Sequence, residues 1–215
     1  SAGGPRGFTG QALFLPDGRL IGTLSHSELC SSSGCQYRVF QFDFQSRTYL
    51  PFNVLQNENS FSGSGLSLSK DDKTLVKFGT DLSDCSNPNS QVVLQSLESS
   101  ESEIFDFAGE SLIGAVYDPH SGQIVLSRNT GCRDPAAQSW ASVGGLSPGE
   151  DILTMQFWTP ETNQKIDFVP GIQPAWSTDG EWLAFRSCLT QDSSSTWSPD
   201  SGTAPQIYLF SPAKD

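Results

Sequence analysis

Few stretches of this 215-residue chain combine residue types that could do chemistry. The segment GLSPG (145–149) has the Gly-x-Ser-x-Gly spacing of a hydrolase nucleophile elbow. In such an elbow, the residue after the serine donates its backbone N–H to the oxyanion. Here that residue is Pro148, which has no N–H to donate. We therefore expect an ordinary loop turn at 145–149 and no nucleophile.

The other reactive residue types stand apart from one another. His26 follows a predicted second strand, whereas His120 lies in a turn before one, so we expect the two imidazoles at opposite ends of the fold. Adjacent carboxylates such as Asp71 and Asp72 point to opposite faces of an extended strand and cannot flank one substrate. The oxygen-rich segment 81–89 lacks the Gly and terminal Glu of a hand-type Ca²⁺ loop. We expect no catalytic residues, no metal and no cofactor in this chain.

Five cysteines each lie between a predicted second and third strand: Cys30, Cys35, Cys85, Cys132 and Cys188. Cys30 and Cys35 bracket a short loop, which suits a local disulfide that stabilises the fold by about 2 kcal/mol. Free buried thiols and a shared metal site are the alternatives, although no Cys-x-x-Cys pair is present. A disulfide favours an extracytoplasmic location, either periplasmic, on the cell surface or secreted. The pairing of the other three cysteines stays open.

These residues must be positioned by a repeated β-hairpin. In segment 172–187, two apolar runs flank an Asp-Gly turn, which is a hairpin signal. The pattern recurs about every 50 residues, as in propeller repeats. It predicts two sets of equivalent positions. The first set, expected to be buried, is Phe14, Leu68, Tyr117 and Trp176, and the second, seven residues later, is Ile21, Leu75, Ile124 and Leu183.

A third and a fourth apolar run follow most of these hairpins. Four short antiparallel strands per repeat are typical of a β-propeller blade, and we expect almost no helix. The predicted fold is all-β, a single propeller segment of about four four-stranded blades, at residues 10–55, 63–109, 112–170 and 171–215. The fourth blade lacks its last strand, which indicates part of a larger propeller or closure by another segment or chain. Closure by residues 3–9 is the alternative, although they are poor strand material.

The segment PAWSTDGEWLAFRS (174–187) resembles the TolB-type, WD40-like β-propeller repeat, and LFLPDGRLIGTLS (13–25) resembles it more distantly. The resemblance implies a propeller along nearly the whole chain. It does not imply one function, because that family includes periplasmic binding scaffolds and propeller lobes attached to peptidases.

Composition excludes several classes of partner. The net charge is −12, and the 12 Lys and Arg residues are scattered along the chain. A nucleic-acid or anionic membrane surface needs clustered basic residues, so we expect neither partner. No apolar run approaches the roughly 20 residues that span a bilayer.

The connections between second and third strands are the best candidates for a binding face. We expect loops 26–36, 80–90, 129–150 and 188–205 to share one end of the fold. The candidate binding residues are Trp140, Trp197, Arg133 and Arg186, types that dominate interface hot spots. Each loop Trp is either an exposed anchor or a plug folded onto its own blade.

The sequence therefore predicts a non-catalytic scaffold that binds a protein on this face or along the open edge of the fourth blade. A propeller lobe of a larger hydrolase or peptidase, or a propeller that binds a small molecule or glycan, is the alternative.

The cysteine pattern can be tested directly. We expect Cys30 and Cys35 to be bonded to each other, with at most one further disulfide in the chain. Mass spectrometry of peptides from the non-reduced protein would detect the linked pair. Five free thiols would remove the main argument for an oxidising compartment.

Overall fold

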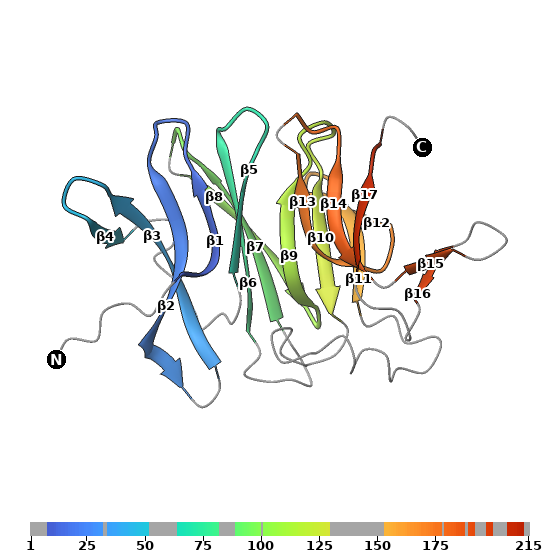
Figure 1. The fold of residues 1–215 in the computed structure, drawn as a ribbon, viewed down its shortest axis with the longest axis horizontal. Coiled ribbons are helices and arrows are strands. Elements are labelled where there is room, and N and C mark those ends of the chain that lie inside the picture. Colours follow the sequence, from blue (N-terminus) through green and yellow to red (C-terminus); the bar gives the residue numbers. More distant parts are fainter. Residues whose placement is uncertain are drawn as a thin grey trace. The chain divides into compact units, whose positions relative to one another are not determined.

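The structure is a computed structural model (Figure 1). It describes residues 8–31, 34–51, 64–81, 89–99, 101–129, 153–177, 179–187, 189–191, 197–199 and 206–212. The chain folds as two compact units, residues 1–111 and 112–215, and each is considered by itself.

The first unit holds two four-stranded antiparallel sheets. Neighbouring strands follow the chain order in both sheets, β1-β2-β3-β4 and β5-β6-β7-β8. The first sheet is built from β1 (Phe8–Phe14), β2 (Leu20–Ser31), β3 (Gly34–Asp43) and β4 (Thr48–Pro51). The second is built from β5 (Ser64–Leu68), β6 (Thr74–Asp81), β7 (Asn89–Ser96) and β8 (Ser102–Ala108).

The second unit repeats this up-and-down order. Its four-stranded sheet contains β9 (Ser111–Tyr117), β10 (Ile124–Asn129), β11 (Leu153–Thr159) and β12 (Gln164–Asp167). A three-stranded sheet follows, made of β13 (Ile172–Trp176), β14 (Leu183–Ser187) and β17 (Gln206–Phe210). A separate hairpin pairs β15 (Leu189–Gln191) with β16 (Trp197–Pro199).

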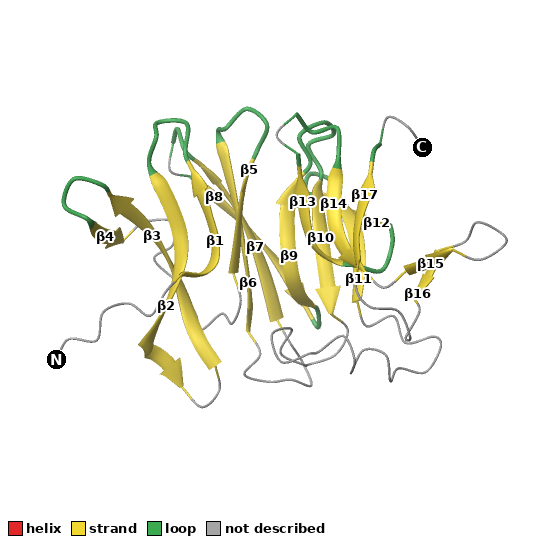
Figure 2. Ribbon diagram, viewed as in Figure 1, coloured by secondary structure: helices red, strands yellow, loops and turns green. Residues whose placement is uncertain are grey.

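The all-β prediction is confirmed, since the described residues form strands and turns and no helix (Figure 2). Every predicted apolar run became a strand of the expected sheet. The small β15–β16 hairpin was not predicted, because its runs are only three residues long and carry no alternating apolar pattern.

A residue in the left-handed region reverses the chain between the first and second strands of each sheet. These residues are Gly18 (φ 84°), Asp72 (φ 57°), Gly122 (φ 75°) and Gly180 (φ 74°). The aspartate at 72 occupies the position that glycine holds elsewhere, and short polar side chains tolerate this conformation better than most.

The first of these turns is one residue shorter than the others. The backbone N–H of Leu15 donates to the carbonyl of Arg19 at 2.7 Å, four residues on, whereas that of Ser69 reaches Thr74, five residues on, at 2.9 Å. As a result, β1 and β2 pair one residue out of step with the aligned sequence, and Ile21 lies opposite Leu13. In the second sheet, Leu75 lies opposite Leu68, as the alignment expects.

The prediction that the four aligned first-strand residues are equally buried is wrong. Leu68, Tyr117 and Trp176 are half-buried, and Phe14 is 64% exposed. A one-residue shift in pairing moves a strand residue to the other face of the sheet. The short turn therefore places Leu13, rather than Phe14, beside the core of the first unit.

The second aligned set is buried in both units. Ile21, Leu75, Ile124 and Leu183 are all fully buried. In the first unit, Ile21 and Leu15 of one sheet pack against Leu66 and Leu75 of the next. Full burial of one aliphatic side chain contributes about 1.5–3 kcal/mol, so this position in each hairpin is a main source of stability.

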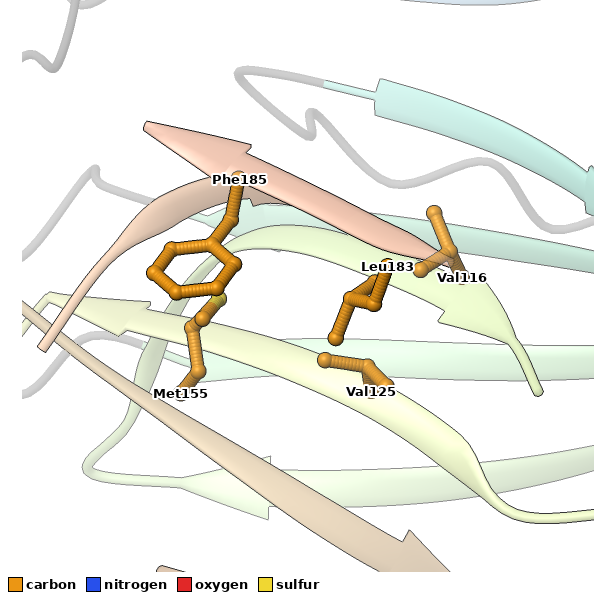
Figure 3. Packing of buried hydrophobic residues seen from close by; sticks show 5 residues of the cluster. All are labelled: Val116, Val125, Met155, Leu183 and Phe185. Carbon is orange, nitrogen blue, oxygen red and sulfur yellow. The ribbon is translucent and has the colours of Figure 1, made fainter. Parts of the chain in front are cut away.

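The second unit has the same kind of sheet-on-sheet core. Val125 and Met155 of its first sheet pack against Leu183 and Phe185 of its second, with Val116 beside them (Figure 3). Aromatic rings extend the contact, since Phe168 lies between neighbouring rings at centroid distances of 4.7–6.0 Å; these neighbours are Phe157, Phe185 and Phe210.

The last sheet has three strands among the described residues, and β17 is its outer strand. Ile207 and Leu209 of β17 are 77% and 65% exposed, whereas Tyr208 and Phe210, which alternate with them, are half-buried. Residues 3–7 of the segment considered for closure lie outside the described residues. Residues 8 and 9 belong to β1, which pairs with β2.

The close contact between two turns of the second unit gives a stability prediction. A Cβ at Gly180 would lie 2.5 Å from Pro119 Cγ and 2.9 Å from His120 Nε2, at a φ of 74°. We expect Gly180→Ala to lower the free energy of unfolding by roughly 3 kcal/mol, because overpacking adds to left-handed backbone strain. Urea denaturation would measure the loss.

Gly122→Ala is the matched control in the same unit. Gly122 has a similar φ of 75°, but a Cβ there meets only Tyr117 Oη at 3.5 Å, an ordinary contact. Backbone strain alone should cost about 1–2 kcal/mol. Equal losses for the two variants would show that the turn contact at Gly180 contributes nothing.

Candidate functional site

The predicted binding residues fall mostly where side chains are not described. Trp140 and Arg133 lie outside the described residues, and Trp197 begins β16, for which only the backbone is described. Arg186 is half-buried in β14, between the paired residues Ile172 and Ile207. The binding role of these four residues stays a prediction.

The two cysteines expected to form a disulfide occupy opposite places in one hairpin. Cys30 of β2 and Cys35 of β3 are direct partners in the strand register, next to the last pair Ser31 and Gly34. Directly opposed residues of antiparallel strands have Cα atoms about 4.5–5.5 Å apart, a separation that a disulfide can span. The backbone is therefore compatible with the pairing, while Cys85, Cys132 and Cys188 lie outside the described residues.

Serine and aspartate side chains in the tight turns hold the turns together. Ser69 Oγ donates to Asp71 Oδ1 at 2.6 Å and accepts from the N–H of Thr74 at 2.9 Å. Ser177 and Asp179 repeat this arrangement in the last sheet, where the hydroxyl accepts a backbone N–H at 3.0 Å. Such side-chain bonds to nearby backbone are typical of turns.

The third turn uses a different aspartate for the same purpose. Asp118, which is buried, accepts the backbone N–H of His120 at 2.8 Å and the hydroxyl of Ser121 at 2.6 Å. In the first turn, Asp17 accepts both the backbone N–H and the Nε–H of Arg19. Asp71 and Asp72 lie in a turn rather than on a strand, where Asp71 accepts the N–H of Lys73 and Asp72 supplies the left-handed residue.

The hydrogen bonds in the second and fourth turns favour the charged forms of Asp71 and Asp179. The Ser69 hydroxyl and then the Lys73 N–H lower the pKa of Asp71 below its ordinary value of 3.8. The Ser177 hydroxyl and the Glu181 N–H lower the pKa of Asp179 in the same way, with a small contribution from His120. Asp71 and Asp179 are solvent-exposed, so these two turns present charged caps rather than a shielded catalytic centre.

Exposed aromatic residues at the first sheet were missed by sequence analysis. Phe14 and Phe44 are 64% and 56% exposed, and their rings stack at a centroid distance of 6.5 Å. Phe42 meets Phe44 edge-to-face at 5.0 Å. The alternation of Phe40, Phe42 and Phe44 places them on one face of a strand. The sequence does not show whether that face is covered, because this depends on the turn length that sets the register.

Among the residues that the structure describes, no three His, Cys, Asp or Glu side chains gather as a possible metal site. The described segments also contain no helix long and apolar enough to cross a bilayer.

Comparison with known proteins shows the fold. No family model and no curated protein matches the sequence. The β-propeller domain of the Trilobed protease from Pyrococcus furiosus matches with a TM-score of 0.52 at 13% identity over 95% of this chain. This chain spans 55% of that one. The likeness shows that the chain has a β-propeller fold.

Two further structures match less well. They are the acylaminoacyl peptidase of Pyrococcus horikoshii (TM-score 0.48, 13% identity, covering 93% of this chain and 30% of that one) and dipeptidyl peptidase 4 of Porphyromonas gingivalis (0.48, 9%, 94% and 31%).

The turn aspartates give a pH prediction. A carboxyl whose folded pKa is lowered stabilises the protein above its unfolded value of 3.8, and that contribution disappears as the pH falls through the lower folded value. We expect the free energy of unfolding to fall as the pH drops below about 4, and to fall less steeply in an Asp71→Asn, Asp179→Asn variant. Chemical denaturation between pH 2 and 7, roughly the range over which carboxyls titrate, would measure both slopes.

Asp106→Asn is the control for this comparison, because Asp106 accepts an exposed amide from Gln91 across two strands and closes no turn. If both variants retain the slope of the unaltered protein, other carboxylates control its acid stability.

Proposed function

We propose that this chain is a non-catalytic β-propeller module of the TolB type that binds a protein partner outside the cytoplasm. The observation that carries the proposal is the use of its reactive side chains at the tight-turn end. There the described Ser and Asp residues are engaged in closing the turns, as in the pair Ser69 and Asp71 and the pair Ser177 and Asp179. Residues held in this way maintain a rigid scaffold rather than carry out a reaction.

The opposite ends of the strands are the proposed binding face. Within each unit the connections after the second strands leave the sheets at that end, after β2 and β6 in the first unit and after β10 and β14 in the second, where the longest, 130–152, joins β10 to β11. Binding residues are commonly placed on loops that a rigid scaffold positions. Trp140 and Trp197 lie in two of these connections, and a large aromatic side chain is a frequent interface anchor.

The extracytoplasmic location rests on the opposed backbone positions of Cys30 and Cys35, which suit a disulfide.

A propeller lobe of a peptidase is the second candidate function. It is favoured by one observation, the likeness to the propeller domain of the Trilobed protease. In that case, the partner of the loop face would be a catalytic domain, and the propeller would control access of substrates to it. Folds of this kind serve many functions, so the identity of the partner decides between the two candidates.

A photoreactive amino acid at position 197 would identify the partner. We expect it to form a specific adduct that mass spectrometry can identify, whereas the same label at Asp179, in a tight turn, should form none. An adduct with a hydrolase domain would select the second candidate. Adducts from position 179 alone would contradict the proposed binding face.

Affinity measurements with the identified partner provide the quantitative test. Trp140→Ala or Trp197→Ala should weaken binding by about tenfold or more with the melting temperature nearly unchanged. Asp179→Ala should lower the melting temperature, because Ser177 Oγ and the Glu181 N–H lose their acceptor, and should leave binding unchanged. A fall in melting temperature with either Trp variant would instead identify that side chain as a plug on its own blade.

A further inference from the structure

Each sheet has two faces, and the register defines them. We call the leading face of the last sheet the side that carries Trp176, Leu183 and Phe210, which are direct partners across its three strands. Leu183 and Phe210 pack on the preceding sheet. The trailing face is the opposite side, with the partners Ala184 and Leu209 next to Arg186 and Ile207.

The trailing face of the last sheet has register positions equivalent to those of the trailing face of the β9–β12 sheet. That second face is covered within the same unit. Aligning the pair Leu183–Phe210 with the pair Ile124–Trp158 makes Leu209 equivalent to Phe157, and Ile207 to Met155. Met155 is fully buried because the leading face of the last sheet packs on it. Its equivalent, Ile207, is 77% exposed.

The first sheet has the complementary feature, an exposed leading face. Its register places Phe14 opposite Leu20 and Leu20 opposite Phe42. Counted as strand pairs from the turn, these three positions correspond to Trp176, Leu183 and Phe210 of the last sheet, one residue out of step with the sequence alignment that matches Ile21 with Leu183. An aromatic, a leucine and a phenylalanine therefore recur in the same order. Leu183 is fully buried, whereas Leu20 is half-buried and Phe14 is 64% exposed.

We propose that the trailing face of the last sheet, at Ile207 and Leu209, binds the leading face of the first sheet, at Phe14, Leu20 and Phe42, of a second copy of this chain. The packing inside residues 112–215 is the template, because there a leading face of aromatic residues and leucine covers a trailing face of aliphatic and aromatic residues. The exposed leading face of the first sheet likewise carries aromatic residues and leucine, and the exposed trailing face of the last sheet likewise carries aliphatic residues. Self-association would therefore continue an interface that the chain already contains.

Charge permits this contact. The register positions that define the two faces carry apolar residues and the cation Arg186, and no carboxylate. The net charge of −12 opposes association of two copies at long range, and salt screens that repulsion. The association should accordingly strengthen between low and moderate ionic strength.

The contact joins two different surfaces, so it is heterologous. Each copy offers one leading face and one trailing face, and such a contact closes into a ring or continues into longer assemblies. This property separates the proposal from pairing of the β17 edge with itself, which would use one surface twice.

Sedimentation velocity of the 215-residue chain over a range of micromolar concentrations tests the proposal. We expect the unaltered protein to form dimers or larger species. Ile207→Asp with Leu209→Asp, and separately Phe14→Asp with Phe44→Asp, should each weaken association at least tenfold. The milder pair Ile207→Thr and Leu209→Thr retains strand propensity and should give an intermediate effect. Circular dichroism and melting temperature would confirm that each variant is folded.

Mixing the two aspartate variants is the decisive experiment. Each lacks one of the two faces, so neither can associate with itself, but the intact leading face of one can bind the intact trailing face of the other. An equimolar mixture should therefore recover a species with the mass of two chains. A surface that pairs with itself would give no such recovery, and the Phe14 and Phe44 variant alone would still dimerise.

Ile104→Asp and Ile166→Asp are the matched controls. These residues are 51% and 49% exposed on the outer strands β8 and β12, away from the proposed faces, and both variants should associate normally. A monomer at all concentrations and salt levels would overturn the proposal and would assign the open face to other strands or another protein. Recovery in the mixture without association of the unaltered chain would likewise contradict it.

Discussion

The number of residues in the first turn of each sheet controls the rest of the structure, because it sets the register of the hairpin. Side chains alternate between faces along a strand, so one residue more or less in the turn exchanges the covered and exposed sets. The shorter turn closed by Leu15 and Arg19 has this effect. It brings Ile21 and Leu13 to the core and leaves Phe14 outside.

The turns can serve this purpose because their polar side chains stabilise one geometry. In every turn an aspartate accepts the backbone N–H two residues on. In the second and fourth sheets a serine also accepts the N–H five residues on. Satisfying turn N–H groups locally disfavours alternative pairings of the strands. The connections at the other end differ in length from sheet to sheet, while the order of the strands stays the same.

Much of the fold could be predicted because propeller repeats are built from local signals. Alternating apolar runs and left-handed turn residues lie close together in sequence, and they located the strands of all four sheets and the buried set that includes Leu75 and Leu183. The exposure of Phe14 could not be predicted, since it depends on a turn one residue shorter. The β15–β16 hairpin was missed because strands of three residues leave no periodic pattern. The binding loops have no such pattern either, and their role was inferred from position and residue type alone.

Stacked sheets create a general difficulty at any face that is not covered. In a repeat architecture each unit packs on its neighbour through the same pair of surfaces, so an exposed surface retains affinity for the type of surface that covers its equivalents. Ile207 and Leu209 illustrate this, because Met155, the counterpart of Ile207, shows what such a face contacts when it is buried.

Polar residues at positions 207 and 209 would remove that affinity. The chain instead places apolar side chains on both the first and the last sheet, and its net charge of −12 acts only through long-range repulsion that salt screens. Apolar side chains so placed are costly unless they bind something, which is the physical reason to regard the two faces as interfaces rather than as ordinary surface.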